Sequence, residues 1–390
     1  MNSKKYDVIV VGAGFAGATI AERMANILNK KVLVIDQREN IGGNMYDYME
    51  ENILIHQYGP HLFHTNIERV YNYLSNFTKW FSYEHRVLGK VNDKLVPIPF
   101  NLTSIENTFV KEKANKIKKA LLEHFEMEKK IPILELKKID DQEINELAEF
   151  IYEKVFLHYT LKQWGLSPDE IDKEVTGRVP VFISRDDRYF QDKYQYMPDG
   201  GYTKLISKML DNKNIDIRLK TNAKELIKIE NDTLYYNDIK FTGKVIYTGP
   251  IDELFDYRYG DLPYRSLKFV FEKKDMEYFQ PVATVNYPTK EDLFTRITEY
   301  KHMTMKNCKS SKTIIMKEYP CAYDRKSKDA NIPYYPINNS VNDNLYNKYF
   351  EDALKVDNLY LLGRLAQYKY YNMDLVINEA LNLFDKIKED

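Results

Sequence analysis

The amino-acid sequence predicts an α/β fold with a buried parallel sheet, and three features near its N-terminus support this prediction. Four consecutive β-branched residues, Val8–Val11, form an apolar run typical of a strand that is buried on both faces. An Ala-rich segment of helical character follows it. A second apolar run, Val32–Ile35, comes next and ends at Asp36. This strand–helix–strand order predicts a βαβ unit.

Glycines occupy the turn between the first strand and the helix. Gly12, Gly14 and Gly17 have the G-x-G-x-x-G spacing, which allows a tight turn, a close approach to a pyrophosphate and close packing of helix on strand. Free N–H groups at the start of the helix favour phosphate. Asp36 follows Gly14 by about 20 residues, the place of a carboxylate that binds a ribose hydroxyl. We therefore expect a Rossmann-like dinucleotide-binding domain rather than an ordinary glycine-rich turn.

The residues after Asp36 indicate which dinucleotide is bound. An arginine, Arg38, is followed by the pair Gly42-Gly43. This pattern is similar to the extended fingerprint of FAD proteins in the glutathione-reductase and amine-oxidase group. FAD is thus the expected cofactor, and NAD is the alternative. The expected cofactor-binding residues of this region are Gly12, Gly14, Phe15, Ala16, Gly17, Asp36, Gln37, Arg38, Gly43 and Asn44.

Composition limits the class of protein. With 390 residues, the chain is long enough for two or three domains. Its net charge of −1 gives no overall field that would attract nucleic acid or a membrane surface. Two cysteines argue against a disulfide framework and fit a reducing compartment. No apolar run approaches the roughly 18 residues of a membrane helix, and we expect the N-terminal apolar run to be a nucleotide-binding strand and not a signal peptide. We expect a cytoplasmic protein with no nucleic-acid partner and no membrane span.

In the middle of the chain the predicted secondary structure changes twice, from a loop and hairpin to helices and then to strands. A Gly-Pro turn carrying His61 and His64 suits a loop over a flat cofactor, and no ligand set at metal spacing surrounds the two histidines. Residues 84–100 predict a hairpin with its turn at Asn92-Asp93. Charged segments with helical spacing follow in 101–172. Later β-rich runs predict an antiparallel sheet: 268–272, 281–286, 294–299 and 312–319.

The C-terminal part of the chain is expected to come back to the cofactor-binding site. A strand that begins near Asn358 ends at Gly363-Arg364, and a helix is expected to start at Met373-Asp374. The N-terminus of this helix would then be aimed at the flavin.

Six motifs, taken in order along the chain, resemble signatures of the bacterial UDP-galactopyranose mutase family. They are Tyr58-Gly-Pro-His61-Leu-Phe-His64-Thr65, Tyr159-Thr160-Leu-Lys-Gln-Trp164-Gly165, Thr176-Gly-Arg178-Val-Pro180, Thr295-Arg296-Ile-Thr-Glu299-Tyr-Lys-His302, Pro333-Tyr334-Tyr335-Pro336-Ile337 and Gly363-Arg364-Leu-Ala-Gln-Tyr368-Lys-Tyr370.

The resemblance implies a Rossmann-like FAD-binding domain with an inserted helical bundle and an antiparallel substrate-binding sheet. The implied FAD-binding domain comprises 1–84, 192–260 and 340–390. The implied helical insertion comprises 101–172, and the implied substrate sheet comprises 85–100, 173–191 and 261–339.

The resemblance also implies an activity. The family interconverts UDP-galactopyranose and UDP-galactofuranose through an adduct between N5 of the reduced flavin and the sugar, with no net redox change. The product would supply precursors for cell-surface polysaccharide, and a homodimer is expected.

Residue roles carry over from the motifs. The implied catalytic residues are Arg178, Arg296 and His64. Arg178 and Arg296 would stabilise the diphosphate, as charged forks suited to bidentate hydrogen bonds, and His64 would lie near the flavin and assist its positioning or protonation. Phe156, Tyr159, Trp164 and Asn286 resemble the uridine site. The remaining implied substrate residues are Thr160, Tyr189, Tyr334, Tyr335 and Tyr370. The remaining implied cofactor residues are His61, Arg364, Met373 and Asp374.

Three alternatives remain open at the level of sequence. One is a flavin oxidase of the amine-oxidase type, which would have no use for paired arginines and a uridine platform. Another is a non-catalytic relative built like the GDP-dissociation inhibitors, against which Gly42-Gly43 and Arg364 argue. A related mutase acting on UDP-N-acetylgalactosamine is the third. The chain departs from the family at Asn372, where most relatives have aspartate.

Overall fold

The computed structural model describes residues 6–165, 180–304 and 309–389. Its first layer is a parallel five-stranded sheet in the order β13-β2-β1-β17-β23. The strands are β1 (Val8–Val11), β2 (Val32–Ile35), β13 (Ile215–Arg218), β17 (Lys244–Tyr247) and β23 (Leu359–Leu361). The expected βαβ unit is confirmed, with Val8 opposite Val32 and Val11 opposite Ile35.

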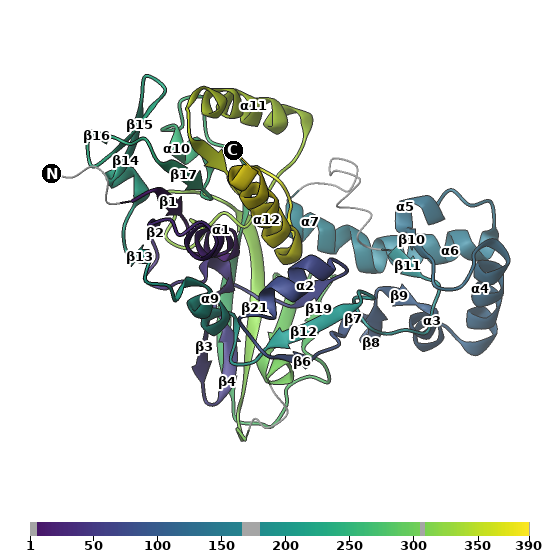
Figure 1. The fold of residues 1–390 in the computed structure, drawn as a ribbon. Helices are drawn as coiled ribbons and strands as arrows, with labels where there is room; N and C mark the ends of the chain where they lie inside the picture. The colour runs from purple at the N-terminus through teal and green to yellow at the C-terminus, as the bar shows by residue number, and fades with distance from the viewer. Residues whose placement is uncertain (1–5, 166–179, 305–308, 390) are drawn as a thin grey trace.

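Three helices lie together on this sheet (Figure 1). Helix α1 (Phe15–Asn26) packs between α9 (Tyr202–Leu210) and α12 (Met373–Glu389). Ten of the twelve residues of α1 are buried, because it is covered by the sheet on one side and by helices on others. The expected start of the last helix at Met373 is confirmed.

A seven-stranded sheet forms the second layer, in the order β22-β18-β21-β20-β19-β7-β8. Its strands are β7 (Val87–Val91), β8 (Lys94–Ile98), β18 (Tyr264–Lys274), β19 (Thr284–Asn286), β20 (Arg296–Glu299), β21 (Thr313–Ala322) and β22 (Tyr335–Pro336). The four expected β-rich runs correspond to β18–β21. All pairings are antiparallel except that of β19 with β7.

The expected hairpin is also confirmed. Asn92 and Asp93, between β7 and β8, have φ angles of 48° and 60°. Two successive left-handed residues produce the turn whose twist matches that of paired strands, and Asn and Asp tolerate this conformation.

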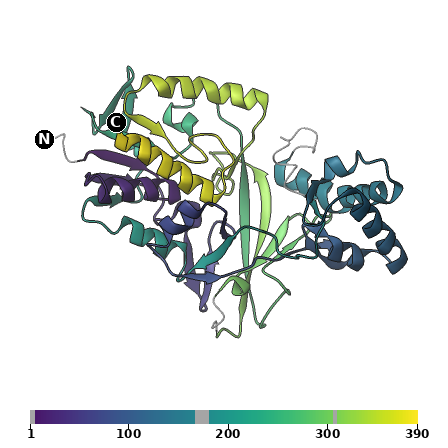
Figure 2. The same ribbon diagram turned by 45° about the vertical axis from the view of Figure 1, so that its right-hand side comes forward.

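A helical lobe projects from one end of the seven-stranded sheet (Figure 2). It contains α3 (Leu102–Thr108), α4 (Lys111–His124), α5 (Ile133–Leu136), α6 (Gln142–Ile151), the π-helical turn η2 (Tyr152–Leu157) and α7 (His158–Trp164). The lobe has its own apolar core, centred on residues such as Ile117, Leu121 and Leu147. Helix α7 leads back from the lobe to the main body, where it contacts β21.

One segment differs from the expected arrangement. We expected 173–191 in the substrate sheet, yet its described strand β11 (Pro180–Phe182) pairs with β9 (Phe100–Asn101) and β10 (Lys130–Pro132). This small sheet lies at the base of the helical lobe. The difference arises because Val181 and Ile183 are apolar and pack in the core of the lobe rather than with the long strands.

The remaining elements connect these parts. They are η1 (Gly43–Met45), β3 (Asp47–Glu50), β4 (Ile53–His56), β5 (Phe63–Thr65), α2 (Glu68–Leu74), β6 (Trp80–Ser82), β12 (Tyr194–Pro198), η4 (Ala223–Glu225), β14 (Ile227–Glu230), β15 (Thr233–Tyr236), β16 (Ile239–Lys240), α10 (Ile251–Leu254), η5 (Tyr300–Met303) and α11 (Ser340–Lys355). Strand β12 lies between β5 and β6 in a three-stranded sheet.

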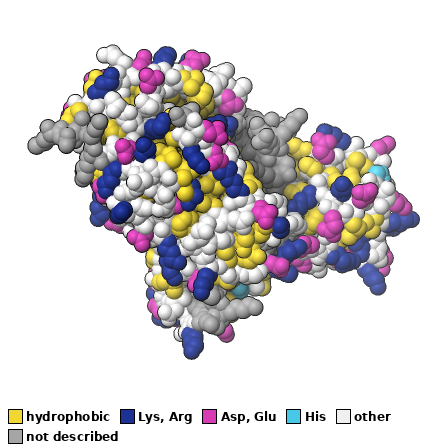
Figure 3. Space-filling view, viewed as in Figure 1, with side chains coloured by type: hydrophobic (Ala, Val, Ile, Leu, Met, Phe, Trp, Pro, Cys, Tyr) yellow, Lys and Arg dark blue, Asp and Glu magenta, His cyan; other side chains and the backbone are white. Residues whose placement is uncertain are grey.

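On the face shown in Figure 3, basic and acidic side chains are interspersed, in keeping with the net charge of −1. None of the helices in the described part of the chain is long and apolar enough to cross a membrane.

Candidate active site

A cavity of about 930 Å³ lies where the two sheets meet. One wall is formed by the glycine turn after β1 and by the ends of β2 and β17, and another by residues of β18 to β21. Ligands of open α/β sheets bind at the carboxyl ends of parallel strands, so the cavity has the expected position. It continues from this edge onto the antiparallel sheet.

Two glycine turns form the floor of the cavity. The backbone N–H of Gly42 donates to the carbonyl of Ala13, with an N–O distance of 2.9 Å. A Cβ on Gly43 would lie 3.0 Å from the Cα of Gly14, so the two turns touch. Gly14 caps α1 without a side-chain hydrogen bond, which leaves N–H groups at the helix start to bind a phosphate.

Gly17 has a packing role in this region. A Cβ there would lie 1.9 Å from the carbonyl oxygen of Gly12. Only glycine therefore allows α1 to pack this closely on the end of β1, as the motif predicts.

Arg38 provides a test of whether these residues fit a dinucleotide. Its Nη2 donates to Asn44 Oδ1 at 2.9 Å, and its guanidinium lies 4.3 Å from the centre of the Tyr58 ring. Its Nη1 is buried and has no hydrogen-bond partner among the described residues. A buried cationic donor left without a partner is costly. The cradle therefore fits a ligand that brings an anionic acceptor to Arg38, as a pyrophosphate would.

Asp36 stabilises the same cradle. Its Oδ2 accepts from the backbone of Ala13 at 2.8 Å and its Oδ1 accepts from the backbone of Arg38 at 2.9 Å. The carboxylate thus holds the glycine turn and the arginine turn together at the edge of the cavity.

Arg364 organises the aromatic wall. It donates to the carbonyl of Tyr334 at 3.0 Å and twice to that of Tyr371, at 2.5 and 3.2 Å. Its guanidinium also lies over Tyr335 and Tyr370, whose rings stack with centroids 5.3 Å apart. The arginine therefore fixes the positions of two cavity tyrosines.

An ion pair lies on the antiparallel wall. Arg296 and Glu318 are register partners on β20 and β21, and Arg296 Nε and Nη2 lie 3.0 and 2.8 Å from Glu318 Oε2. Burial opposes the charge on Arg296, but the facing carboxylate outweighs burial and raises the pKa of the guanidinium. Glu318 Oε1 is buried and has no partner in the described chain. Arg296 therefore stays cationic in the cavity wall.

Three histidines line the cavity. Burial lowers the pKa of His61 well below its ordinary value, and its buried Nδ1 has no partner among described residues. Burial likewise lowers the pKa of His85 to about 3. His64 Nδ1 lies 2.8 Å from Asp192 Oδ2. His61 and His85 are thus neutral near neutral pH, and His64 has a carboxylate partner.

Most of the expected site residues meet at this cavity. Those that line it are Gly12, Gly14, Phe15, Ala16, Asp36, Gln37, Arg38, Gly43, Asn44, His61, His64, Tyr159, Tyr189, Asn286, Arg296, Tyr334, Tyr335, Arg364, Tyr370 and Met373. Both Tyr334 and Tyr335 contribute. Asp374 lies just behind the wall, where it accepts a hydrogen bond from Thr65 Oγ1 at 2.8 Å.

Three expected substrate residues do not line the cavity, and a fourth falls outside the described part of the chain. Phe156 is 1% exposed and packs in the core of the helical lobe, beside Val155 and Ile151. Thr160 is buried in α7. Trp164 contacts the rings of Tyr335 and Tyr370, which line the cavity. Arg178 lies outside the described residues.

Several cavity residues were not predicted from the sequence, including His85, Phe190 and Glu318. Asp192, which pairs with His64, was also missed. None of the four belongs to a recognisable motif. The alternation of β21 places Glu318 on one face of the sheet, but only the strand register brings it opposite Arg296.

The parallel sheet, the glycine turns and the shared cavity define a dinucleotide-binding enzyme of the α/β class with an added antiparallel platform. The model of an NAD(P)-binding Rossmann-like domain matches residues 10–77, and the model of the UDP-galactopyranose mutase family (GLF) matches residues 154–370.

Curated relatives extend this match over the full chain. A UDP-galactopyranose mutase of Mycoplasma genitalium is 37% identical over 382 residues, which are 97% of this chain and 93% of the relative. A probable UDP-galactopyranose mutase of Klebsiella pneumoniae is 34% identical, over 99% of this chain and 95% of the relative. The chain belongs to the UDP-galactopyranose mutase family, and it is an enzyme.

A further curated relative and a solved structure are also similar to this chain. A dTDP-fucopyranose mutase of Escherichia coli is 34% identical and covers 96% of each chain. Among solved structures, a reduced UDP-galactopyranose mutase superposes with a TM-score of 0.71 at 14% identity, covering 98% of this chain and 94% of that chain. This structural likeness supports the fold.

Proposed function

We propose that the protein binds FAD and interconverts the pyranose and furanose forms of a nucleotide-linked galactose, with UDP-galactose as substrate. One observation carries this proposal: a single cavity joins the dinucleotide cradle at Gly14 and Arg38 to the wall that contains Arg296 and Asn286. A cofactor and a nucleotide sugar bound there would lie in contact, as a reaction between them requires.

The residues of the dinucleotide cradle would make the contacts to the cofactor. The start of α1 and Arg38 would hold the pyrophosphate, and Asp36 would hold the ribose. Reduced flavin supplies a nucleophilic nitrogen when bound, and the isomerisation needs no net oxidation.

The protein's own residues act on the substrate. Arg296 offers a fixed positive charge to the diphosphate and stabilises negative charge as the diphosphate leaves. Arg178 would share this role. Burial raises the pKa values of Tyr159, Tyr334 and Tyr335, so their hydroxyls remain neutral donors at neutral pH. Together these groups position the sugar and exclude water.

The cofactor is tested first, by the absorption spectrum of the purified protein. We expect flavin absorbance released intact on denaturation, and less flavin per chain in Arg38→Met than in the parent protein. A colourless protein that cannot be reconstituted with FAD would contradict the cofactor assignment.

The reaction is tested by incubating the protein with UDP-galactose and dithionite and separating the products. We expect furanose product, dependence on reduced flavin, and far less than one equivalent of reductant consumed per turnover. Consumption of one equivalent per turnover would favour an oxidoreductase instead.

The identities of the sugar and of the base are tested third. The Escherichia coli relative is named a dTDP-fucopyranose mutase at the same identity as the Klebsiella relative. Competition between UDP-galactose, UDP-N-acetylgalactosamine and dTDP-fucose will rank the three by kcat/KM. No turnover of UDP-galactose would contradict the primary substrate. A homodimer and a cytoplasmic location stay predictions.

A further inference from the structure

His64 is held by two residues of one segment. Phe190 stacks on its imidazole, with centroids 3.6 Å apart and planes 13° from parallel. Asp192 Oδ2 lies 2.8 Å from its Nδ1. Phe190 and Asp192 precede β12, which pairs with the strand that carries His64. Stacking fixes the plane of the ring, and the carboxylate fixes its rotation within that plane.

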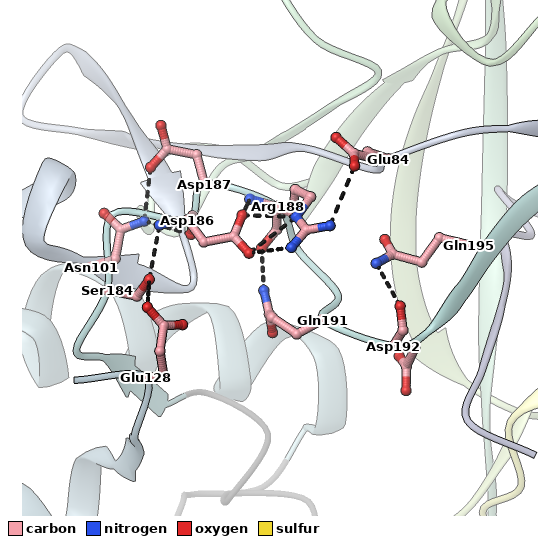
Figure 4. A network of polar contacts seen from close by, with 10 residues as sticks. All are labelled: Glu84, Asn101, Glu128, Ser184, Asp186, Asp187, Arg188, Gln191, Asp192 and Gln195. Atoms are coloured by element: carbon pink, nitrogen blue, oxygen red, sulfur yellow. Dashed lines mark hydrogen bonds and ion pairs between the residues drawn. The ribbon is translucent and has the colours of Figure 1, made fainter. Parts of the chain in front are cut away.

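Asp192 is itself held in place. Asn66 Nδ2 donates to its Oδ1 at 2.6 Å. Gln195 Nε2 donates to its backbone carbonyl at 2.9 Å, as Figure 4 shows. The backbone N–H of Lys193 donates to Asn66 Oδ1 at 2.9 Å, which fixes the orientation of the Asn66 amide. The hydrogen bond from His64 lowers the pKa of Asp192, which is therefore a carboxylate near neutral pH and can only accept hydrogen bonds.

A carboxylate at Nδ1 determines where the ring proton lies. Neutral imidazole carries one proton, and the hydrogen bond made by one nitrogen decides which nitrogen has it. An acceptor at Nδ1 places the proton there and leaves Nε2 as the free lone pair. No hydrogen bond to Nε2 is formed by the described residues, and His64 lines the cavity.

We propose that Asp192, supported by Asn66 and Phe190, is a positioning residue that holds His64 in the Nδ1–H form, so that the Nε2 lone pair is available to accept a proton at the cavity. This inference rests on the proposed function for its effect on turnover. The tautomer itself is independent of that function.

The role of Asp192 can be tested by exchanging the carboxylate of Asp192 with the amide of Asn66. In Asp192→Asn the new amide oxygen must face the Asn66 NH₂, because Asn66 is fixed by Lys193. Its NH₂ then faces His64 Nδ1 and drives the ring proton to Nε2. In the double variant Asp192→Asn with Asn66→Asp, a carboxylate at position 66 accepts from the new NH₂. The new amide oxygen then faces His64 again, and the Nδ1–H form is restored.

The readout is the ¹⁵N spectrum of histidine-labelled protein, with the His64 signals assigned by their loss in His64→Gln. We expect the Nδ1–H form in the parent protein, the Nε2–H form in Asp192→Asn and the Nδ1–H form in the double variant. In parallel, kcat should fall about 10²-fold in the single variant, at the lower end of the effect of a positioned proton donor or acceptor, and recover in the double variant. KM should change little, because the substrate contacts remain.

Asp187→Asn is the matched control. Asp187 lies on the same segment and accepts a hydrogen bond from Asn101 at 2.9 Å, away from His64 (Figure 4). It should leave both the His64 signals and kcat unchanged. Asn66→Ala should also keep the Nδ1–H form, because the carboxylate remains.

Two results would overturn the inference. An unchanged His64 tautomer in Asp192→Asn would show that Asp192 does not determine the tautomer. A change to the Nε2–H form with full kcat would show that the tautomer of His64 has no role in turnover. Absence of mutase activity in the parent protein would instead reject the proposed function, while the tautomer measurements would still decide the Asp192–His64 relationship.

Discussion

Arg296 and Glu318 stand directly opposite each other on β20 and β21, and two guanidinium nitrogens share one carboxylate oxygen. Glu318 is 1% exposed and its second oxygen has no partner in the described chain. Arg296 therefore presents a positive charge at the cavity wall, and the carboxylate of Glu318 partly neutralises that charge.

Glu318→Gln tests this balance. Removing the carboxylate leaves Arg296 without a counter-charge, so we expect the free energy of unfolding to fall by about 1–3 kcal/mol. A dianionic ligand should restore the missing charge, so UDP should bind more tightly than to the parent protein. Denaturant unfolding and UDP titration measure the two effects. Weaker UDP binding in this variant would show that Glu318, and not Arg296, dominates ligand binding.

The variant Asn372→Asp tests whether the asparagine that replaces the family's usual aspartate affects ligand binding. It lines the cavity and immediately precedes α12, whose Val376 N–H donates to its carbonyl at 3.1 Å. Asn372→Asp should preserve the fold, because an aspartate is well tolerated before a helix. It should weaken UDP binding by about 1 kcal/mol, the scale of one partly screened charge. Titration of UDP at low and moderate salt is the measurement. Equal or tighter binding would show that the side chain points away from the diphosphate.

Lys162 is predicted to position Trp164. Its Nζ donates to the carbonyls of Tyr287 at 2.5 Å and of Asp292 and Phe294 at 2.9 Å, which attaches α7 to the loop between β19 and β20. Lys162→Met should release this end of α7 and lower the free energy of unfolding by about 1.5–3 kcal/mol, the scale of a hydrogen bond to a charged group. UDP binding should weaken as well, because Trp164 contacts Tyr335 and Tyr370 of the cavity wall. Tryptophan emission in a Trp80→Phe background reports the environment of Trp164.

Lys301→Met provides the control for Lys162. Lys301 also donates to two carbonyls, those of Glu277 and Ser310, at 2.8 and 2.7 Å. Its loss should lower stability and leave UDP affinity unchanged. If both lysine variants weaken UDP binding equally, general destabilisation explains the effect.

His85 is predicted to contribute to acid sensitivity. Burial, together with Arg296 and His64, lowers its pKa to about 3, whereas an unfolded chain binds this proton near the ordinary value of about 6.5. Acidification through this window therefore favours the unfolded state by about 1.4 kcal/mol per pH unit. In His85→Gln the loss of unfolding free energy between pH 7 and pH 5 should be smaller by about 2 kcal/mol.

The comparison for this prediction is His124→Gln, at an exposed end of α4. It should keep the acid sensitivity of the parent protein. An unchanged loss in His85→Gln would show that the ring is accessible to protons in the folded state.

The parts of this protein that could be predicted from the sequence are local. The β-branched run, the glycine spacing and Asp36 predicted the βαβ unit and its cradle, because strand burial, turn geometry and helix start each depend on residues close together in the chain. The hairpin turn at Asn92-Asp93 was predictable for the same reason.

The parts that could not be predicted depend on contacts between distant segments. Phe156 and Tyr159 are three residues apart, yet one packs in the helical lobe and the other reaches the cavity. A pattern of aromatic residues cannot distinguish these two environments, because both are apolar.

By itself, the sequence determined the N-terminal βαβ unit with its dinucleotide cradle, the hairpin at Asn92-Asp93, the runs that form β18–β21 and the family to which the motifs belong. Only the tertiary structure decided that Glu318 faces Arg296 and that Asp192 holds His64. Both pairings depend on strand register and on loop closure over more than a dozen residues. Hydrophobic patterning fixes which face of a strand is buried, but it leaves the partner of each polar side chain to the three-dimensional packing.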